Sequence, residues 1–451
     1  MRPVPFDRAA AREAAAAILD LKGADGVEVV FTGSTIGLTR YANSQIISNT
    51  VQETIRAHVR TAVDRRVAAA STNQLDPSSL ALAAERALEA ARSSPEDADF
   101  PGLPAPGEVG RADPVMRFDE ATAESSPTDR AAAIAKILGI TGGHRAAGIF
   151  ETSSHAFGVI SSTGIDCYDC FSRCIASCLT DTGESTGYKE ASSHSRTDVD
   201  VEAVAEGAVD KAKVSRNAVD APPGRYGVVL EPHAVAILLE YLSYTGFGAK
   251  QVLDGESFLS TRTDDMVASR AVTIADDVSH ELSVGIGFDF EGVPRKRVAV
   301  IDAGRATGPV TDLRTAKKMR VAVSGHNSGS NEFGPYASNV VMDGGDASLE
   351  ELVAGVDDGL YVTRFHYVNV LDRPRTLLTG MTRDGTWRIR HGELAEPVHN
   401  LRFADSVLDV LSSAERAGRD LEAFGPDYGS FGSQVAPALS ASLTFSSATS
   451  H

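Results

Sequence analysis

The sequence predicts an α+β protein. Its amino-terminal half should form antiparallel sheets with flanking helices, and its carboxy-terminal half should be β-rich with a strand and a helix at its entry. Three observations support this: short apolar–polar alternations in the first half, helical periodicity between them, and a break at Asp220–Gly224 before a second β-rich region. We therefore expect two domains, residues 1–220 and residues 221–451.

The first half contains both kinds of pattern in turn. Strands are expected where apolar and polar residues alternate. They are Gly26–Phe31, Thr35–Arg40, Glu53–Val63, Arg66–Ala70, Gly148–Glu151 and Phe157–Ser161. Helices are expected at Arg8–Leu21, Asp129–Leu138 and Val201–Ser215. A further helix begins after an Asp76 cap, has Pro77 in its first turn and runs to Arg92.

The four cysteines lie close together, at 167, 170, 174 and 178. On a helix they would share one face and suggest a zinc or iron–sulfur site. On a strand after the Thr163–Gly164 turn, Cys170, Cys174 and Cys178 share one face, and Cys170 and Cys178 lie about 26 Å apart. We favour the strand with buried thiols, and metal binding or redox chemistry remain alternatives.

Composition limits the partners. With 43 basic and 61 acidic side chains the net charge is −18, which disfavours nucleic acid. No apolar run reaches the length of a membrane span, and the first residues do not resemble a signal peptide. The expected location is the cytoplasm, without membrane attachment.

The segment Arg225–Gly246 holds a strand followed by an apolar helix, and it resembles the TldD/TldE (PmbA) metallopeptidase family. Further segments that resemble this family extend over most of the chain. They are Arg40–Ile46, Ser71–Asp76, Gly287–Pro294, Asp302–Gly304, Asp312–Ala316, Gly380–Trp387 and His391–Val398. The resemblance implies a carboxy-terminal domain of TldD/PmbA type.

TldD-type members carry HExxxH on this helix, where two histidines hold a metal ion and a glutamate takes a proton from the metal-bound water. Here the histidine positions are Glu240 and Thr245, and the glutamate position is Tyr241. The family's cysteine ligand is missing from the stretch Tyr428–Pro437. No two of the eleven histidines are three, four or five residues apart, although distant residues such as His233, Glu240 and His366 could still converge.

The resemblance therefore implies a TldE-like subunit with no cofactor of its own and no catalytic residue. Its implied partner is an HExxxH-bearing TldD-like chain that holds a zinc-type metal, and its implied substrate is an extended or unfolded peptide. Glu240, Tyr241, Tyr244, Thr245, Arg364 and His366 are the candidates to line the substrate cleft. Two other functions stay open: a hydrolase of small amides or modified peptides, and a peptide-binding scaffold that forms a homodimer.

A polar segment, Ser324–Pro335, is rich in serine, asparagine and glycine. Its composition predicts a surface loop outside the core, which lines a binding cleft or is a mobile connection.

Overall fold

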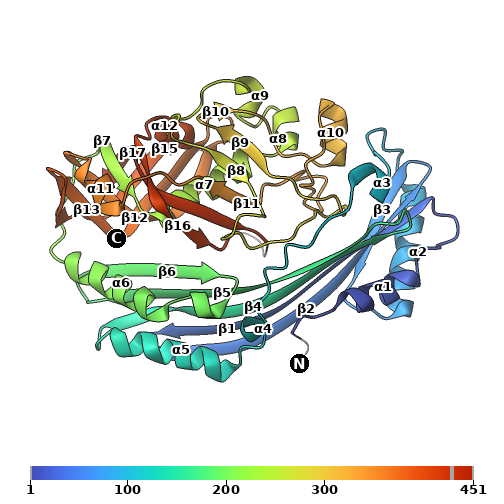
Figure 1. Ribbon diagram of the computed structural model, residues 1–451, viewed down its shortest axis with the longest axis horizontal. Coiled ribbons are helices and arrows are strands. Elements are labelled where there is room, and N and C mark those ends of the chain that lie inside the picture. The colour runs from blue at the N-terminus through green and yellow to red at the C-terminus, as the bar shows by residue number, and fades with distance from the viewer. Residues whose placement is uncertain (1–2, 427–430, 449–451) are drawn as a thin grey trace.

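The structure is a computed structural model that describes residues 3–426 and 431–448. It contains a six-stranded antiparallel sheet from the first half and an eleven-stranded sheet from the second, which confirms the predicted α+β class (Figure 1). The first sheet has the order β3-β2-β1-β4-β5-β6. Its strands are β1 Gly26–Ala42, β2 Gln45–Val63, β3 Arg66–Thr72, β4 Arg145–Ser161, β5 Asp166–Asp181 and β6 Thr186–Ser193.

The first strand is longer than the alternation predicted. The two expected segments Gly26–Phe31 and Thr35–Arg40 form one continuous strand, β1. Gly33 interrupts the apolar pattern between them because a Cβ there would lie 2.9 Å from Pro5 Cβ. The glycine thus reflects a close approach of the amino-terminal segment and does not end the strand.

The helices of the first half are α1 Arg8–Ala16, α2 Pro77–Ser93, α3 Pro106–Val109, α4 Glu120–Ala123, α5 Pro127–Ile140 and α6 Val201–Val214, with a 3₁₀ turn at Arg196–Asp198. The predicted Asp76 cap is present, since Ser79 N donates to Asp76 Oδ1 at 3.0 Å. The first helix ends at Ala16, earlier than the expected Leu21. Figure 1 shows α1, α2 and α5 on the side of the first sheet that faces away from the second sheet.

The cysteines lie on β5, as the strand interpretation predicted. Cys174 and Cys178 are fully buried and Cys170 is 8% exposed, whereas Cys167 is half-buried. Cys174 and Cys178 pack with α5 and α6 residues on one face of the sheet. The Cys167 thiol donates to Gly292 O at 3.6 Å, so it faces the second half of the chain.

The second half is built around the long strand β17, Ser433–Ala448, which pairs with β7, β11, β15 and β16. The strands before β17 are β7 Gly224–Leu230, β8 Ile274–Asp276, β9 Val298–Asp302, β10 Arg305–Ala306, β11 Asn339–Met342, β12 Asp358–Asp372, β13 Leu377–Arg390, β14 Glu393–Pro397, β15 Leu401–Ser406 and β16 Arg416–Phe424. The helices are α7 Pro232–Gly246, α8 Ala249–Leu253, α9 Leu259–Arg262, α10 Leu313–Met319, α11 Leu349–Ala354 and α12 Val407–Ser412. Among the described residues, no helix has the length and apolar character needed to cross a membrane.

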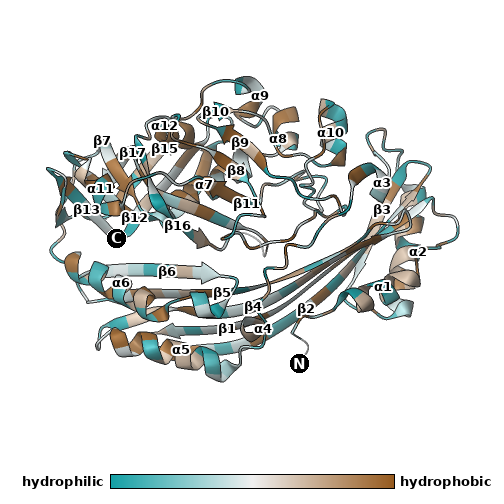
Figure 2. Cartoon of the chain, viewed as in Figure 1, coloured by the Kyte–Doolittle hydropathy of each residue, from teal (hydrophilic) through white to brown (hydrophobic). Residues whose placement is uncertain are grey.

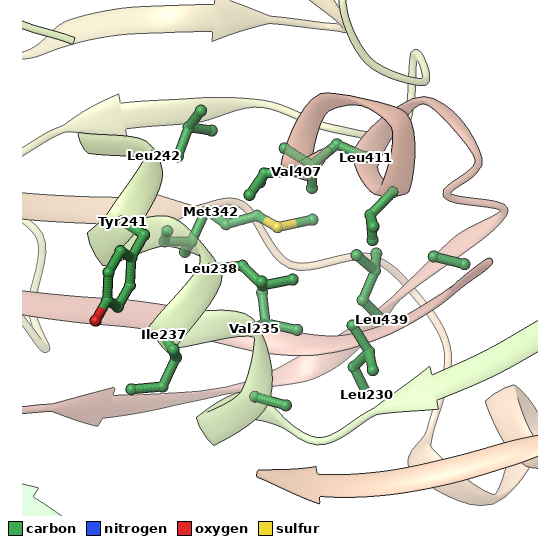
Figure 3. Packing of buried hydrophobic residues seen from close by; sticks show 14 of the residues in the cluster. Leu230, Val235, Ile237, Leu238, Tyr241, Leu242, Met342, Val407, Leu411 and Leu439 are labelled. Carbon is green, nitrogen blue, oxygen red and sulfur yellow. The ribbon is translucent and has the colours of Figure 1, made fainter. Parts of the chain in front are cut away.

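The largest hydrophobic core surrounds α7. Figure 2 shows hydrophobic segments in this helix and in the strands around it. In Figure 3, Val235, Leu238 and Leu242 project toward side chains of β17, β11 and α12. A second contact region joins the two halves, where Phe157 and Phe171 of the first sheet pack with Val284, Ile286 and Phe288. The segment between β8 and β9 therefore packs on the face of the first sheet that is opposite α1, α2 and α5.

Candidate functional site

The helix α7 follows directly from strand β7 and lies almost wholly in the interior. Its sequence is apolar on all sides, which is typical of a helix with no solvent face. Pro232 occupies its first turn, where a missing N–H costs nothing. The side chain of Glu231, which precedes it, accepts hydrogen bonds from Lys211 Nζ at 2.6 Å and Tyr361 Oη at 2.8 Å. This partly buried ion pair ties the start of α7 to α6 of the first half.

Three predicted site residues on α7 are buried. Glu240 is 3% exposed, Tyr241 is 8% exposed and Thr245 is 1% exposed. Tyr241 Oη donates to Val368 O of β12 at 2.6 Å, and Thr245 Oγ1 donates to Tyr241 O within the helix at 2.8 Å. Burial, together with the nearby Glu240 carboxylate, raises the pKa of Tyr336. Two of these three side chains thus serve the packing of α7.

These residues do not fit the zinc-type metal that the family's helix implies. Zinc favours neutral imidazole nitrogen and thiolate sulfur, but the positions hold one carboxylate, a phenol and an alcohol, the last two of which donate to backbone oxygens. Across residues 3–426 and 431–448, no three His, Cys, Asp or Glu side chains are placed to hold a metal ion. The possible distant set of His233, Glu240 and His366 is therefore not assembled, and His233 instead stacks on Phe424 at 4.8 Å.

Tyr244 lies on the accessible end of α7 and is 38% exposed. Its ring stacks on Phe333 with a centroid distance of 5.7 Å. Its hydroxyl accepts a hydrogen bond from Arg373 Nη2 at 3.1 Å, and Arg373 also pairs with Glu256 at 2.9 Å. Of the predicted residues on α7, Tyr244 is the one whose side chain a ligand can reach.

The two predicted residues of β12 have different surroundings. Arg364 binds Asp384 of β13, with an Nε–Oδ2 distance of 2.8 Å, and its guanidinium lies 3.8 Å from the ring centroid of Tyr188 on β6. Arg364 therefore spans the two sheets. His366 is half-buried beside Tyr367, and burial with the nearby Arg383 and Arg364 lowers its pKa.

The polar loop that begins at Ser324 does not behave as expected. Its first part is buried, with His326 fully inaccessible, so the prediction that this segment lies outside the core is wrong there. His326 Nε2 lies 3.0 Å from Asp276 Oδ1, and His326 Nδ1 lies 2.9 Å from Ser324 Oγ. The sequence Ser324-Gly325-His326 gives no signal that His326 is buried, because its partner Asp276 is distant in the chain.

The Ser324, His326 and Asp276 chain contains the residue types of a hydrolase triad, but its surroundings make it structural. All three side chains are at most 7% exposed. Ser324 Oγ also lies 3.1 Å from Thr311 O, and Asp276 Oδ2 accepts from Asn339 N at 2.8 Å. A nucleophile must be reached by its substrate. The network instead joins β8, β11 and the segment around Thr311.

A groove of about 500 Å³ lies between β6, the last strand of the first sheet, and β16 of the second. Its walls include Ser192 and His194 on one side and Leu421 and Ala423 on the other. Lys189 Nζ reaches Glu422 Oε1 at 2.9 Å across it. In the stretch where the family's cysteine is expected, Tyr428–Ser430 lie outside the described residues.

Comparison with known proteins agrees with this architecture. Residues 223–446 match the PmbA/TldA metallopeptidase C-terminal domain, and residues 27–91 match PmbA/TldA metallopeptidase domain 1. A metalloprotease from Methanothermobacter thermautotrophicus is 26% identical over 49% of this chain and 49% of its own length. A TldD homologue from Haemophilus influenzae is 28% identical over 48% of this chain and 45% of its own. These alignments thus span about half the length of the curated relatives.

Two solved structures share the fold over almost the whole chain. TldE from Thermococcus kodakarensis superposes with a TM-score of 0.86 at 20% identity, and the match covers 96% of this chain and 99% of that one. A putative modulator of a DNA gyrase from Thermotoga maritima gives a TM-score of 0.82 at 18% identity, with 97% and 99% covered. Because family models match residues 27–91 and 223–446, the chain belongs to the TldD/TldE (PmbA) metallopeptidase family.

Proposed function

We propose that this chain is a TldE-like, non-catalytic subunit of a cytoplasmic heteromeric metallopeptidase, and that its partner is a TldD-like chain with HExxxH. The observation that carries this proposal is the state of α7. Where a catalytic member needs two histidines and a glutamate, this chain has Glu240, Tyr241 and Thr245, and the last two hydrogen-bond to its own backbone. The helix α7 packs in the core but lacks the nitrogen and sulfur ligands that zinc favours.

The groove between β6 and β16 supports a role in holding peptide. Both strands lie at margins of their sheets, since β6 pairs only with β5 and β16 only with β17 among the described strands. An extended peptide can add to such a margin through backbone hydrogen bonds, which require no particular side chain. In the proposed complex this subunit closes the chamber and supports the peptide backbone, while the partner's metal site cleaves it.

The predicted cleft residues differ in what they can contribute to this role. Tyr244 is accessible and His366 is half-buried, so both are available to a peptide. Arg364 is already paired with Asp384, which leaves its guanidinium committed to the junction of the two sheets. Tyr244→Ala in the co-expressed complex should therefore raise the KM for an unfolded peptide more than it lowers kcat.

The decisive experiment is native mass spectrometry of the full chain, alone and after co-expression with an HExxxH-bearing relative. Metal content and cleavage of an unfolded peptide are measured on the same samples. We expect a metal-free chain without activity, and a mixed complex whose activity a chelator removes. The proposal fails if the chain alone binds stoichiometric zinc and cleaves the peptide in a chelator-sensitive way.

A substitution series tests the reason for inactivity. Glu240→His, Tyr241→Glu and Thr245→His together restore the letters of the motif, but the cysteine ligand and the surrounding hydrogen bonds would still be missing. We expect no stoichiometric zinc in this variant and no activity without the partner. The single variant Glu240→His is the matched control, because it changes the buried helix without completing the motif. Zinc-dependent cleavage by the triple variant alone would show that the motif letters suffice.

A further inference from the structure

A cavity of about 720 Å³ lies between α1 and the turn that joins β4 to β5. Its walls come from Arg8 and Arg12 of α1, from residues 106 and 110–114 of the connection before α4, and from residues 164–167, where β5 begins. This volume is typical of sites for small organic molecules. The described residues that line the cavity belong neither to α7 nor to the groove between β6 and β16.

The connection that forms one wall is fixed at both ends. At its start, Thr163 Oγ1 donates to Pro104 O. At its end, Val115 N and Met116 N donate to the two carboxylate oxygens of Asp169, at 2.9 and 3.2 Å. Thr163 lies in the turn between β4 and β5, and Asp169 lies on β5. Contacts with the first sheet therefore hold this wall in place, so the cavity is formed before any ligand binds.

Asp166 holds two guanidinium groups beside the cavity. Arg8 Nε lies 3.2 Å from Asp166 Oδ1, and Arg12 Nε donates to Asp166 Oδ2 at 2.7 Å. A guanidinium has five N–H groups. The Nη1 atoms of both side chains form no hydrogen bond with the residues that the structure describes. One carboxylate therefore orients two cations and leaves N–H donors available on both.

Arg111 adds a third cation to the walls. Its side chain is exposed, and it forms no ion pair or hydrogen bond with any residue in the described part of the chain. Three guanidinium groups thus line the cavity, against the two carboxylates of Asp113 and Asp166. The net charge of the whole chain is −18, so this positive excess is local. Positive charge around a cavity raises the local concentration of anions.

Part of the wall is apolar. Pro106 lies against the turn, since a Cβ at Gly164 would be 3.7 Å from Pro106 Cδ. Pro114 and Ile165 also line the cavity. These side chains offer apolar surface to the body of a ligand, and removing such surface from water favours binding.

We propose that this cavity binds a small molecule in which an oxyanionic group, a phosphate monoester or a carboxylate, is joined to a compact apolar body. Arg8, Arg12 and Arg111 donate to the oxyanion, because arginine forms paired, charge-assisted hydrogen bonds with both kinds of group. Asp166 keeps its contacts with α1 and acts as a positioning residue. The inference goes beyond the proposed function and does not depend on it, since no partner subunit is needed for the cavity to form.

Isothermal titration calorimetry of the full chain tests the class of ligand. The probes are phenyl phosphate, benzoate, inorganic phosphate and the neutral benzyl alcohol. We expect both aromatic anions to bind, inorganic phosphate to bind more weakly, and benzyl alcohol to give no binding heat. The tighter of the two aromatic anions identifies the oxyanion. Added salt should weaken binding, because the side chains of Arg8 and Arg12 are 44% and 55% exposed.

Charge substitutions test the site. Arg111→Gln removes a side chain without partners in the described part of the chain, so the fold should be unchanged and anion binding should weaken by about tenfold or more. Asp113→Asn removes a carboxylate from the wall and should tighten binding. Arg375→Gln, at an exposed residue between β12 and β13, is the matched control and should bind the anions as the original chain does.

Cys167 reports where the anion binds. It lines the cavity and is half-buried, whereas the other three cysteines are at most 8% exposed. N-ethylmaleimide should therefore modify Cys167 first, as mass spectrometry of peptides can show. Phenyl phosphate should slow this reaction in the original chain and should have less effect in Arg111→Gln at the same concentration.

Several results would overturn the inference. One is the absence of binding heat with both aromatic anions at millimolar concentration. Equal losses of binding in Arg111→Gln and Arg375→Gln would reveal a general effect of charge and no specific site. Binding that leaves the reaction of Cys167 unchanged would place the anion elsewhere. Inorganic phosphate that binds as tightly as phenyl phosphate would refute the role of the apolar wall.

Discussion

Where the two halves of the chain meet, Arg60 forms ion pairs with two buried carboxylates. Arg60 Nη2 of β2 lies 2.9 Å from Glu28 Oε1 of β1 and 3.5 Å from Glu291 Oε1 of the second half. The carboxylate side chains are 2% and 5% exposed. Burial raises the pKa of Glu291 from 4.5 to about 8; the Arg60 charge opposes this, whereas the nearby Asp289 and Glu28 add to it.

The direction of the resulting pH effect follows from linkage. Because the pKa of Glu291 is higher in the folded chain than in the unfolded chain, folding favours its neutral form. This contribution is complete below about pH 4.5 and is lost as the pH rises through about 8. Each pKa unit corresponds to about 1.4 kcal/mol, so the shift corresponds to a loss on the order of 5 kcal/mol between these limits.

Glu291→Gln removes this titration and keeps the shape of the side chain. We expect the urea midpoint of the original chain to fall relative to that of Glu291→Gln as the pH is raised from 5 to 9. Groups distant from Glu291 are common to both chains, so the difference reports Glu291 together with its coupling to Asp289 and Glu28. Glu89→Gln, at an exposed residue of α2, is the control and should have the same urea midpoint as the original chain at every pH. A constant difference between the original chain and Glu291→Gln over this range would refute the reasoning.

Two further substitutions have defined consequences. Tyr241→Phe removes the hydroxyl that donates to Val368 O. In a urea titration this substitution should lower the free energy of unfolding by about 1–3 kcal/mol. Tyr244→Phe, at an exposed tyrosine, is the control and should lower it by less. Arg364→Ala leaves Asp384, which is 1% exposed, with only the Thr186 hydroxyl and Arg383 at 4.0 Å as partners. It should cost up to about 3 kcal/mol, and an unchanged melting temperature would contradict the pairing.

Local patterns in the sequence predicted part of the first sheet. Alternation located portions of β1 to β4, and the Asp76–Pro77 signal located the start of α2, because both depend on residues that are neighbours in the chain. Strand β6 was not predicted, and β4 was predicted as two segments. The same rules divided β1 in two, since Gly33 is required by contact with Pro5 and not by the local backbone. A distant contact of this kind leaves no periodic signal.

The buried polar contacts could not be predicted from the sequence for a related reason. His326 belongs to a segment with loop composition, and it is buried because Asp276 and Ser324 satisfy its ring nitrogens. Asp276 lies on a different strand, and sequence separation hides the pairing. Arg364 illustrates the same limit, since its partners Tyr188 and Asp384 come from two different sheets.

The architecture of α7 gives a physical reason why a family member can keep this helix without a metal site. Metal ligands are polar groups that need a bound ion or a hydrogen-bond partner when they are buried. Here Tyr241 and Thr245 have backbone partners of their own, and the apolar residues around them belong to the largest core of the chain. With other residues at the ligand positions, the helix holds no buried ligand groups that need a metal ion. It still packs against β7, β12 and β17. The fold and the chemistry are separable at this helix, as the proposed partner role requires.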